Sequence, residues 1–199
     1  MAWQQRIPHM LAVVIVATMV WSFINPYDMR VWWAEMTPIL AIFIGLVATY
    51  RQFQFSNTSY VLMSVLLILH TIGAHYTFAR VPFEWVTEFF DFERNHYDRI
   101  AHFTVGFYAY AAAELLVRKN WARPITAMLF GLFFIMAVAA GYEIIEWQFA
   151  VIEGGDAGIE FLGSQGDEWD AQQDMLADTL GALAALVLFW FSKYRHVTS

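Results

Sequence analysis

The sequence contains no cysteine among its 199 residues. Disulfide bonds and thiolate metal sites are therefore both excluded. Charge is sparse as well, since Asp, Glu, Lys and Arg together make up only 15% of the chain. The basic residues form no patch suited to nucleic acid, and no glycine-rich phosphate loop is present. We therefore expect neither a nucleic-acid partner nor a nucleotide site of that kind.

Apolar and aromatic residues are abundant, at 59% and 18% of the chain. Long apolar runs with charges confined between them indicate an integral membrane protein. We predict an all-α, polytopic membrane helix bundle of about six transmembrane helices, forming a single domain over residues 1–199. The second span is short for a bilayer. The predicted spans are residues 8–24, 36–50, 59–79, 99–117, 125–151 and 171–192.

The distribution of Lys and Arg predicts the orientation of these spans. Seven basic residues lie on the side of the two termini, and four lie on the opposite side, so both termini are predicted to be cytoplasmic. Residues 152–170, on the outer side, hold six carboxylates and no base. A loop this long without structure of its own is often a lid or a binding loop. The seven basic residues are Arg6, Arg51, Arg118, Lys119, Arg123, Lys193 and Arg195.

Three carboxylates follow one another at the start of the last span. Asp170, Asp174 and Asp178 are spaced i, i+4 and i+8, which places them on one stripe of a helix. Three like charges entering an apolar segment are unfavourable unless a cation, a proton or an imidazolium neutralises them. The sequence therefore predicts a neutralising partner for this stripe.

Ionisable residues of the last four spans are expected in the same outer third of the membrane. At 1.5 Å per residue, His75 lies about 6 Å and His70 about 13 Å from the outer end of its span. Carboxylates near helix ends are often solvated or dipole-stabilised, and a single buried histidine often only packs. Glu114 is expected only to pair with Arg118 at i+4. Convergence from four helices nevertheless favours a shared polar site. Its candidate members are His70, His75, Asp98, His102, Glu143, Glu146, Asp174 and Asp178.

Two chemistries fit such a site. Carboxylates and imidazoles without cysteine are ligands for a hard or borderline divalent metal ion, and helix bundles build such sites from facing helices. A metal-free cluster that shares protons is the alternative. The candidate catalytic residues are Asp98, His102 and Glu146. The candidate metal ligands are His70, His75, His102, Glu143, Glu146, Asp174 and Asp178.

Three segments carry a family resemblance: residues 98–103 (DRIAHF), residues 142–146 (YEIIE) and residues 174–181 (DMLADTLG). The chain resembles the uncharacterised bacterial inner-membrane family typified by YjdF. Residues 98–190 more distantly resemble the VanZ-like family, with Asp178 standing where that family usually has asparagine. The resemblance implies a multi-pass protein of the bacterial inner membrane that is associated with the cell envelope.

Three functions remain open on these grounds. The first is a metal-dependent hydrolase or transferase that acts at the outer face on a lipid or lipid-linked envelope substrate. The second is a transporter or proton relay, which intramembrane ionisable residues also mark. The third is a non-catalytic assembly or binding protein in which the polar cluster only holds helices together. Membrane lipids are expected partners in every case, and the oligomeric state is not predicted.

Overall fold

The computed structural model describes residues 3–192 and 194, and these residues form α-helices and no strands. The predicted all-α membrane bundle is confirmed, since six helical segments are long and apolar enough to cross a membrane. Lys193 and Arg195, which entered the predicted orientation, lie outside the described residues. The six segments are α1 (Trp3–Phe23), α2 (Met29–Thr49), α3 (Asn57–Tyr76), α5 with α6 (Tyr97–Val105 and Tyr108–Arg118), α7 (Pro124–Glu153) and α9 (Asp170–Trp190).

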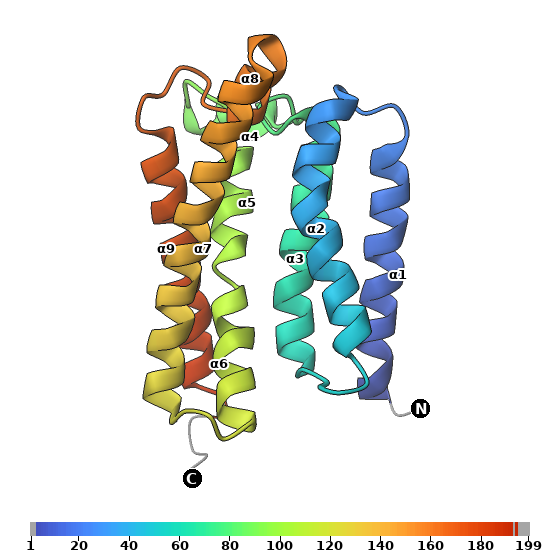
Figure 1. Ribbon diagram of the computed structural model, residues 1–199, viewed down its shortest axis with the longest axis vertical. Helices are drawn as coiled ribbons and strands as arrows, with labels where there is room; N and C mark the ends of the chain where they lie inside the picture. Colours follow the sequence, from blue (N-terminus) through green and yellow to red (C-terminus); the bar gives the residue numbers. More distant parts are fainter. Residues whose placement is uncertain (1–2, 193, 195–199) are drawn as a thin grey trace.

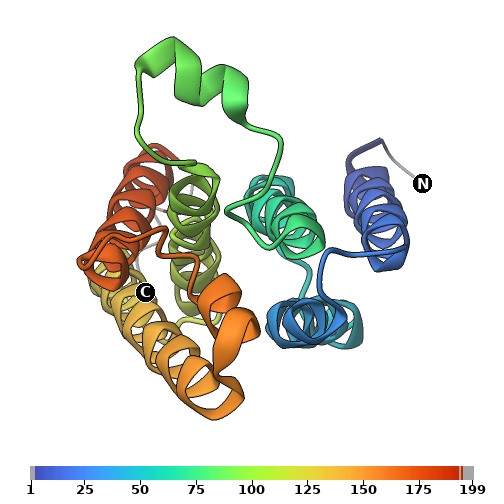
Figure 2. The same cartoon turned by 90° about the horizontal axis from the view of Figure 1, so that it is seen from above.

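The helices form two groups (Figures 1 and 2). In the first group, α1 and α2 both pack against α3. In the second group, α6, α7 and α9 pack against one another, and α5 packs against α9. Contacts of α3 with α5 and α6 join the groups. The short helices α4 (Glu84–Phe90) and α8 (Gly155–Leu162) lie at one end, here named the α8 end; α1 begins and α9 ends at the opposite end (Figure 1).

The second membrane helix begins at Met29, so the predicted start at Met36 is wrong. The Asp28 side chain caps this helix by accepting hydrogen bonds from the backbone N–H groups of Arg30 and Val31, at 2.7 and 3.2 Å. Pro38 therefore lies inside the helix rather than in its first turn. The earlier start brings Glu35 into the membrane-spanning segment.

The fourth predicted span is interrupted rather than continuous. Gly106 and Phe107 separate α5 from α6, where α9 passes against the backbone. A Cβ atom on Gly106 would overlap the backbone of Ala182, and one on Gly181 would overlap the carbonyl oxygen of Phe103. Glycine at both positions therefore allows α5 and α9 to touch through their backbones. This contact sets how closely side chains on the two helices approach.

The acidic segment 152–170 is not a structureless loop, contrary to expectation, because it contains α8. Ala157 and Phe161 on α8 are buried against Val31 of α2 and Phe149 of α7. Gly158 lets the α8 backbone lie close to that of Ala150. An apolar face that can be buried explains why this segment is ordered as a helix. The helix covers the end of the bundle at which the polar residues meet.

Candidate functional site

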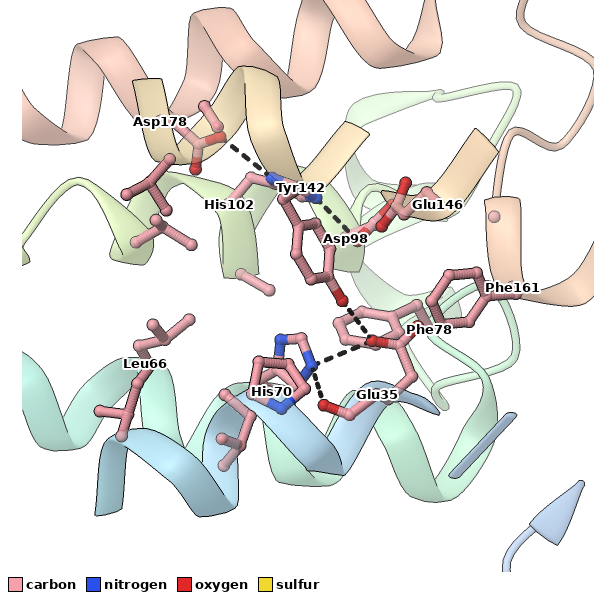
Figure 3. A pocket seen from close by; sticks show the side chains of 18 residues that line it. Glu35, Leu66, His70, Phe78, Asp98, His102, Tyr142, Glu146, Phe161 and Asp178 are labelled. Carbon is pink, nitrogen blue, oxygen red and sulfur yellow. Dashed lines mark hydrogen bonds and ion pairs between the residues drawn. The ribbon is translucent and has the colours of Figure 1, made fainter. Parts of the chain in front are cut away.

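A cavity of about 110 Å³ lies between the two helix groups near the α8 end (Figure 3). Residues of α2, α3, α5, α7 and α9 form its walls, and Phe161 and Gly163 close it from the side of α8. Its polar lining lies toward the α8 end of each helix, together with the rings of Phe78 and Phe161, and the lining deeper in the bundle is apolar. The polar residues are Glu35, His70, Asp98, His102, Tyr142, Glu146 and Asp178; the main apolar residues are Ile39, Ile42, Leu66, Val105, Val138 and Ala139.

His102 lies between two carboxylates. Its Nδ1 is 3.3 Å from Oδ2 of Asp178 on α9, and its Nε2 is 3.7 Å from Oδ1 of Asp98, one turn earlier on α5. All three side chains are buried, and Asp178 is only 1% exposed. The close α5–α9 contact at Gly181 places His102 beside Asp178. A histidine held by a carboxylate in this way has a defined ring orientation and is suited to proton transfer or to metal binding.

Two arginines neutralise the start of the carboxylate stripe on α9. Nη1 of Arg94 and Nη2 of Arg99 lie 2.7 and 2.6 Å from Oδ1 of Asp170. Arg99 also forms an ion pair with Asp174, and both arginines contact Asp167 at 3.2–3.3 Å. The predicted neutralising partner is therefore a pair of guanidinium groups for Asp170 and Asp174, and an imidazole for Asp178.

Asp167 lies just before α9, and its carboxylate contacts both Arg94 and Arg99. Its Oδ1 accepts a hydrogen bond from the Trp169 backbone N–H at 2.9 Å. This bond lowers the pKa of the Asp167 carboxyl, and the charges of Arg99 and Arg94 lower it further. Asp167 therefore stays ionised and forms ion pairs with both guanidinium groups beside Asp170.

A second polar cluster faces His102 across the cavity. The Tyr142 hydroxyl of α7 donates to Oε2 of Glu35 at 2.8 Å, and Nε2 of His70 lies 3.0 Å from the same oxygen. Glu35 is 2% exposed. The Tyr142 ring centroid lies 6.3 Å from that of His102 and 6.4 Å from that of His70. Tyr142 therefore stands between the two polar clusters and bonds one helix group to the other.

The two glutamates of α7 lie in different positions. Glu146 is 7% exposed, lines the cavity, and has no hydrogen bond or ion pair to any described residue. Glu143 lies outside the cavity lining, and its buried Oε1 has no hydrogen-bond partner within the described part of the chain. Of the two, Glu146 is thus the one that an occupant of the cavity would meet.

The structure does not bring His75 to the site. Its Nδ1 lies 3.0 Å from the carbonyl oxygen of Ser22, and its ring packs on Trp21 and Tyr76. His75 follows His70 by five residues, which correspond to about 140° of rotation around an α-helix. The two imidazoles therefore leave α3 on different faces, and that of His75 turns toward α1.

One group of side chains in the described structure is arranged closely enough to hold a metal ion. It consists of Asp98, His102 and Asp174, which offer one ligand atom each within 4.8 Å of one another. The cavity itself carries four carboxylates but only two imidazoles, His70 and His102. An excess of buried carboxylates favours a bound cation or a shared proton.

Glu35 and Tyr142 belong to the site although neither is among the residues predicted for it. Glu35 precedes the predicted start of the second span; the capping residue Asp28 was the available signal for an earlier start. Tyr142 begins the segment 142–146 that carries the family resemblance, but its spacing gave it no role, and its bond to Glu35 follows only from the approach of α7 to α2.

Arg94 and Arg99 are two of the four basic residues that the predicted orientation counts on the outer side, with Arg30 and Arg80. They have no place in the site predicted from the sequence, whereas both bind Asp170 of the stripe.

Glu114 pairs with Arg118 as predicted, with Nη1 of the arginine 2.5 Å from Oε1 of the glutamate. Glu114 is nevertheless fully buried, and it also accepts hydrogen bonds from the hydroxyl groups of Ser56 and Ser59. It lies near the end of the bundle opposite His102, so it takes no part in the site.

These features define an integral membrane protein with a buried His/Asp group at one end of a helical bundle. The chain belongs to the family described as "Predicted membrane protein (DUF2238)", which matches residues 7–195. It is 35% identical to the inner membrane protein YjdF of Escherichia coli (strain K12) over 180 residues, which are 88% of this chain and 85% of that protein. No solved structure matches. The relationship confirms the predicted YjdF-type family and the inner-membrane location.

Proposed function

We propose that the protein is a hydrolase or transferase that acts on a lipid or lipid-linked envelope substrate, with the cavity between the two helix groups as its active site. The observation that carries this proposal is the division of the cavity lining. Acid–base residues lie at the α8 end, and Ile39, Ile42 and Leu66 continue one to two turns deeper. Glu35 and Ile42 are separated by about 10 Å along α2. A lipid in the leaflet at the α8 end presents its polar group and its chain in this same order.

His102 is the central acid–base group in this proposal. Asp178 orients it through Nδ1, which leaves Nε2 directed toward Asp98. Glu146, which has no hydrogen bond or ion pair within the described part of the chain, is placed to exchange a second proton with the substrate or with a water molecule. Glu35, His70 and Tyr142 form the facing wall and position the polar group of the substrate.

A divalent metal ion fits the same residues. Asp98, His102 and Asp174 would hold it, Asp178 would accept the second N–H of His102, and Arg99 would orient Asp174. A ligating histidine usually donates its other ring N–H to a carboxylate in this way. The ion would polarise a carbonyl or phosphoryl oxygen and lower the pKa of a bound water. In the metal-free alternative, the buried carboxylates share protons with one another instead of binding a metal ion.

The distribution of polar residues favours an enzyme over a transporter. The titratable residues of the cavity lie at the α8 end, while its deeper lining is apolar. A relay across the membrane requires ionisable groups at successive depths. Experiment must distinguish catalysis from a purely structural role, in which the cluster only holds the helices together.

The predicted resemblance of residues 98–190 to VanZ-like proteins also points to a substrate in the cell envelope.

Replacing His102 with asparagine tests the catalytic proposal. Wild-type protein reconstituted with total inner-membrane lipid from Escherichia coli is expected to convert one lipid class, followed by mass spectrometry of lipids and water-soluble products. Loss of a general acid–base group is expected to slow this conversion by about 10²–10⁴-fold. Glu88→Gln, an exposed change on α4, is the matched control and should keep the wild-type rate. Equal conversion by wild type and His102→Asn would refute the assigned role of His102.

Metal content of the purified protein separates the metal-dependent site from the proton-sharing one. Elemental analysis is expected to find bound divalent metal in wild type and its loss in Asp174→Asn, because the amide is an uncharged and weaker ligand. Asp178→Asn is expected to be milder, with affinity reduced about 10–100-fold, since Asp178 acts through His102. If wild-type protein contains no metal when purified without chelators, and stays folded after chelation, the metal-dependent site is excluded. Only the proton-sharing or structural interpretation would then remain.

The proposal places the α8 end on the outer side of the inner membrane. The excess of Lys and Arg at the opposite end supports this orientation. Reporter fusions after Lys119 and after Gly158 are expected to report opposite sides of the membrane, with Lys119 cytoplasmic. Fusions that report the same side, or the reverse orientation, would remove the outer-face site from the proposal.

A further inference from the structure

A second cavity of about 240 Å³ lies among α1, α2 and α3, toward the opposite end of the bundle from His102. Its lining is almost entirely apolar, and its walls include Ala12 and Ile15 of α1, Phe43 and Leu46 of α2, and Leu67 of α3. Apolar cavities of about 150 Å³ already bind molecules as large as benzene. This cavity is therefore large enough for a substantial apolar group, and nothing in the proposed reaction uses it.

The apolar cavity adjoins a polar vestibule of about 710 Å³ at the end of the bundle. Pro8, Tyr50 and Tyr60 line both spaces, so the two are neighbours across the same side chains. Tyrosines at this depth are typical of the membrane–water interface. The two spaces together are apolar inside the bundle and polar at its end. Apart from Phe55, the remaining vestibule lining is polar and includes Gln54, Ser56, Tyr110, Arg118 and Ser192.

Arg118 supplies positive charge to the vestibule. Its Nη1 donates to Oε1 of Glu114 at 2.5 Å and to the carbonyl oxygen of Gln54 at 2.7 Å. Its side chain remains 32% exposed. A guanidinium has five N–H donors, and these two bonds use only Nη1. The guanidinium also lies over the Phe53 ring, with its central carbon 4.4 Å from the ring centroid. Its Nε and Nη2 have no hydrogen bond to a described residue, so Arg118 keeps donors for a further anion.

We propose that these two spaces form a binding site for a glycerophospholipid of the leaflet at this end of the protein. One acyl chain occupies the cavity behind Ala12, and the phosphate lies in the vestibule, where it accepts hydrogen bonds from Arg118. Charge-assisted bonds between guanidinium and phosphate are strong and directional. Basic residues near the membrane surface also attract anionic lipid. The site lies at the other end of the protein from the proposed active site and goes beyond that function.

Lipid binding to delipidated protein in detergent tests this site, with palmitoyl-oleoyl phosphatidylglycerol as the probe and native mass spectrometry as the readout. Ala12→Phe fills the apolar cavity and is expected to weaken lipid binding by about tenfold or more. Val20→Phe is the matched control, because Val20 is an exposed residue of the same helix that lines neither space. This control is expected to bind the lipid as wild type does.

The double variant Glu114→Gln/Arg118→Gln tests the phosphate contact without leaving one buried charge unpaired. It is expected to bind the probe about tenfold or more weakly, and to lose the preference for phosphatidylglycerol over the uncharged lipid diacylglycerol. Melting temperatures measured without lipid show whether each variant is folded. Wild-type affinity in folded Ala12→Phe, or absence of a bound lipid in wild type, would overturn the proposal.

Discussion

Gly181→Ala is expected to separate α5 from α9 and to destabilise the protein strongly. A Cβ atom at this position would overlap the carbonyl oxygen of Phe103, a backbone atom that no side-chain rotation can move away. Overpacking of a close contact costs about 1–3 kcal/mol and occasionally more, and a backbone clash belongs at the upper end. The same displacement would pull Asp178 from His102, now 3.3 Å apart. Thermal unfolding in detergent and the proposed lipid conversion should therefore both be impaired.

Gly141→Ala is the matched control for this prediction. Gly141 lies inside α7, and a Cβ atom there would meet nothing within 4 Å. Alanine favours the helix over glycine by about 1 kcal/mol, so this variant should be as stable as wild type or slightly more so. Equal stability of Gly181→Ala and Gly141→Ala would show that α5 and α9 do not depend on their backbone contact.

Arg99→Gln is expected to cause the second large loss of stability. Arg99 forms ion pairs with both Asp170 and Asp174, which are 7% and 2% exposed. Removing one partner of a buried ion pair leaves an uncompensated charge and typically costs about 3–5 kcal/mol. The expected result is a large fall in the midpoint of thermal unfolding in detergent, together with loss of any metal held through Asp174.

Two further variants distinguish this effect from a general loss of surface charge. Arg30→Gln removes an exposed guanidinium paired with Glu153, and exposed pairs contribute only about 0–1 kcal/mol. Asp174→Asn added to Arg99→Gln removes the unpaired carboxylate and should restore part of the lost stability. If Arg99→Gln is no more destabilising than Arg30→Gln, the guanidinium is not the partner that neutralises the α9 carboxylates.

The class of protein and most of its helices follow from the order of the amino acids alone. Apolar side chains are more stable in lipid than in water, and a helix satisfies its own backbone hydrogen bonds there. Composition and length therefore suffice to predict membrane-spanning helices. Local periodicity also places Asp98 and His102 on one face of a helix, and Asp174 and Asp178 on one face of another.

Which of these residues meet depends on how the helices pack. His70 and His75 lie five residues apart on the same helix, yet one faces Glu35 and the cavity while the other packs on Trp21. In the same way, the neutralisation of the α9 stripe by arginines and the bond from Tyr142 to Glu35 join segments that are distant in the chain. Such pairings depend on which helix faces pack together and how closely their backbones approach. Packing is a property of the whole bundle, whereas the pattern of one helix specifies only which residues share its faces.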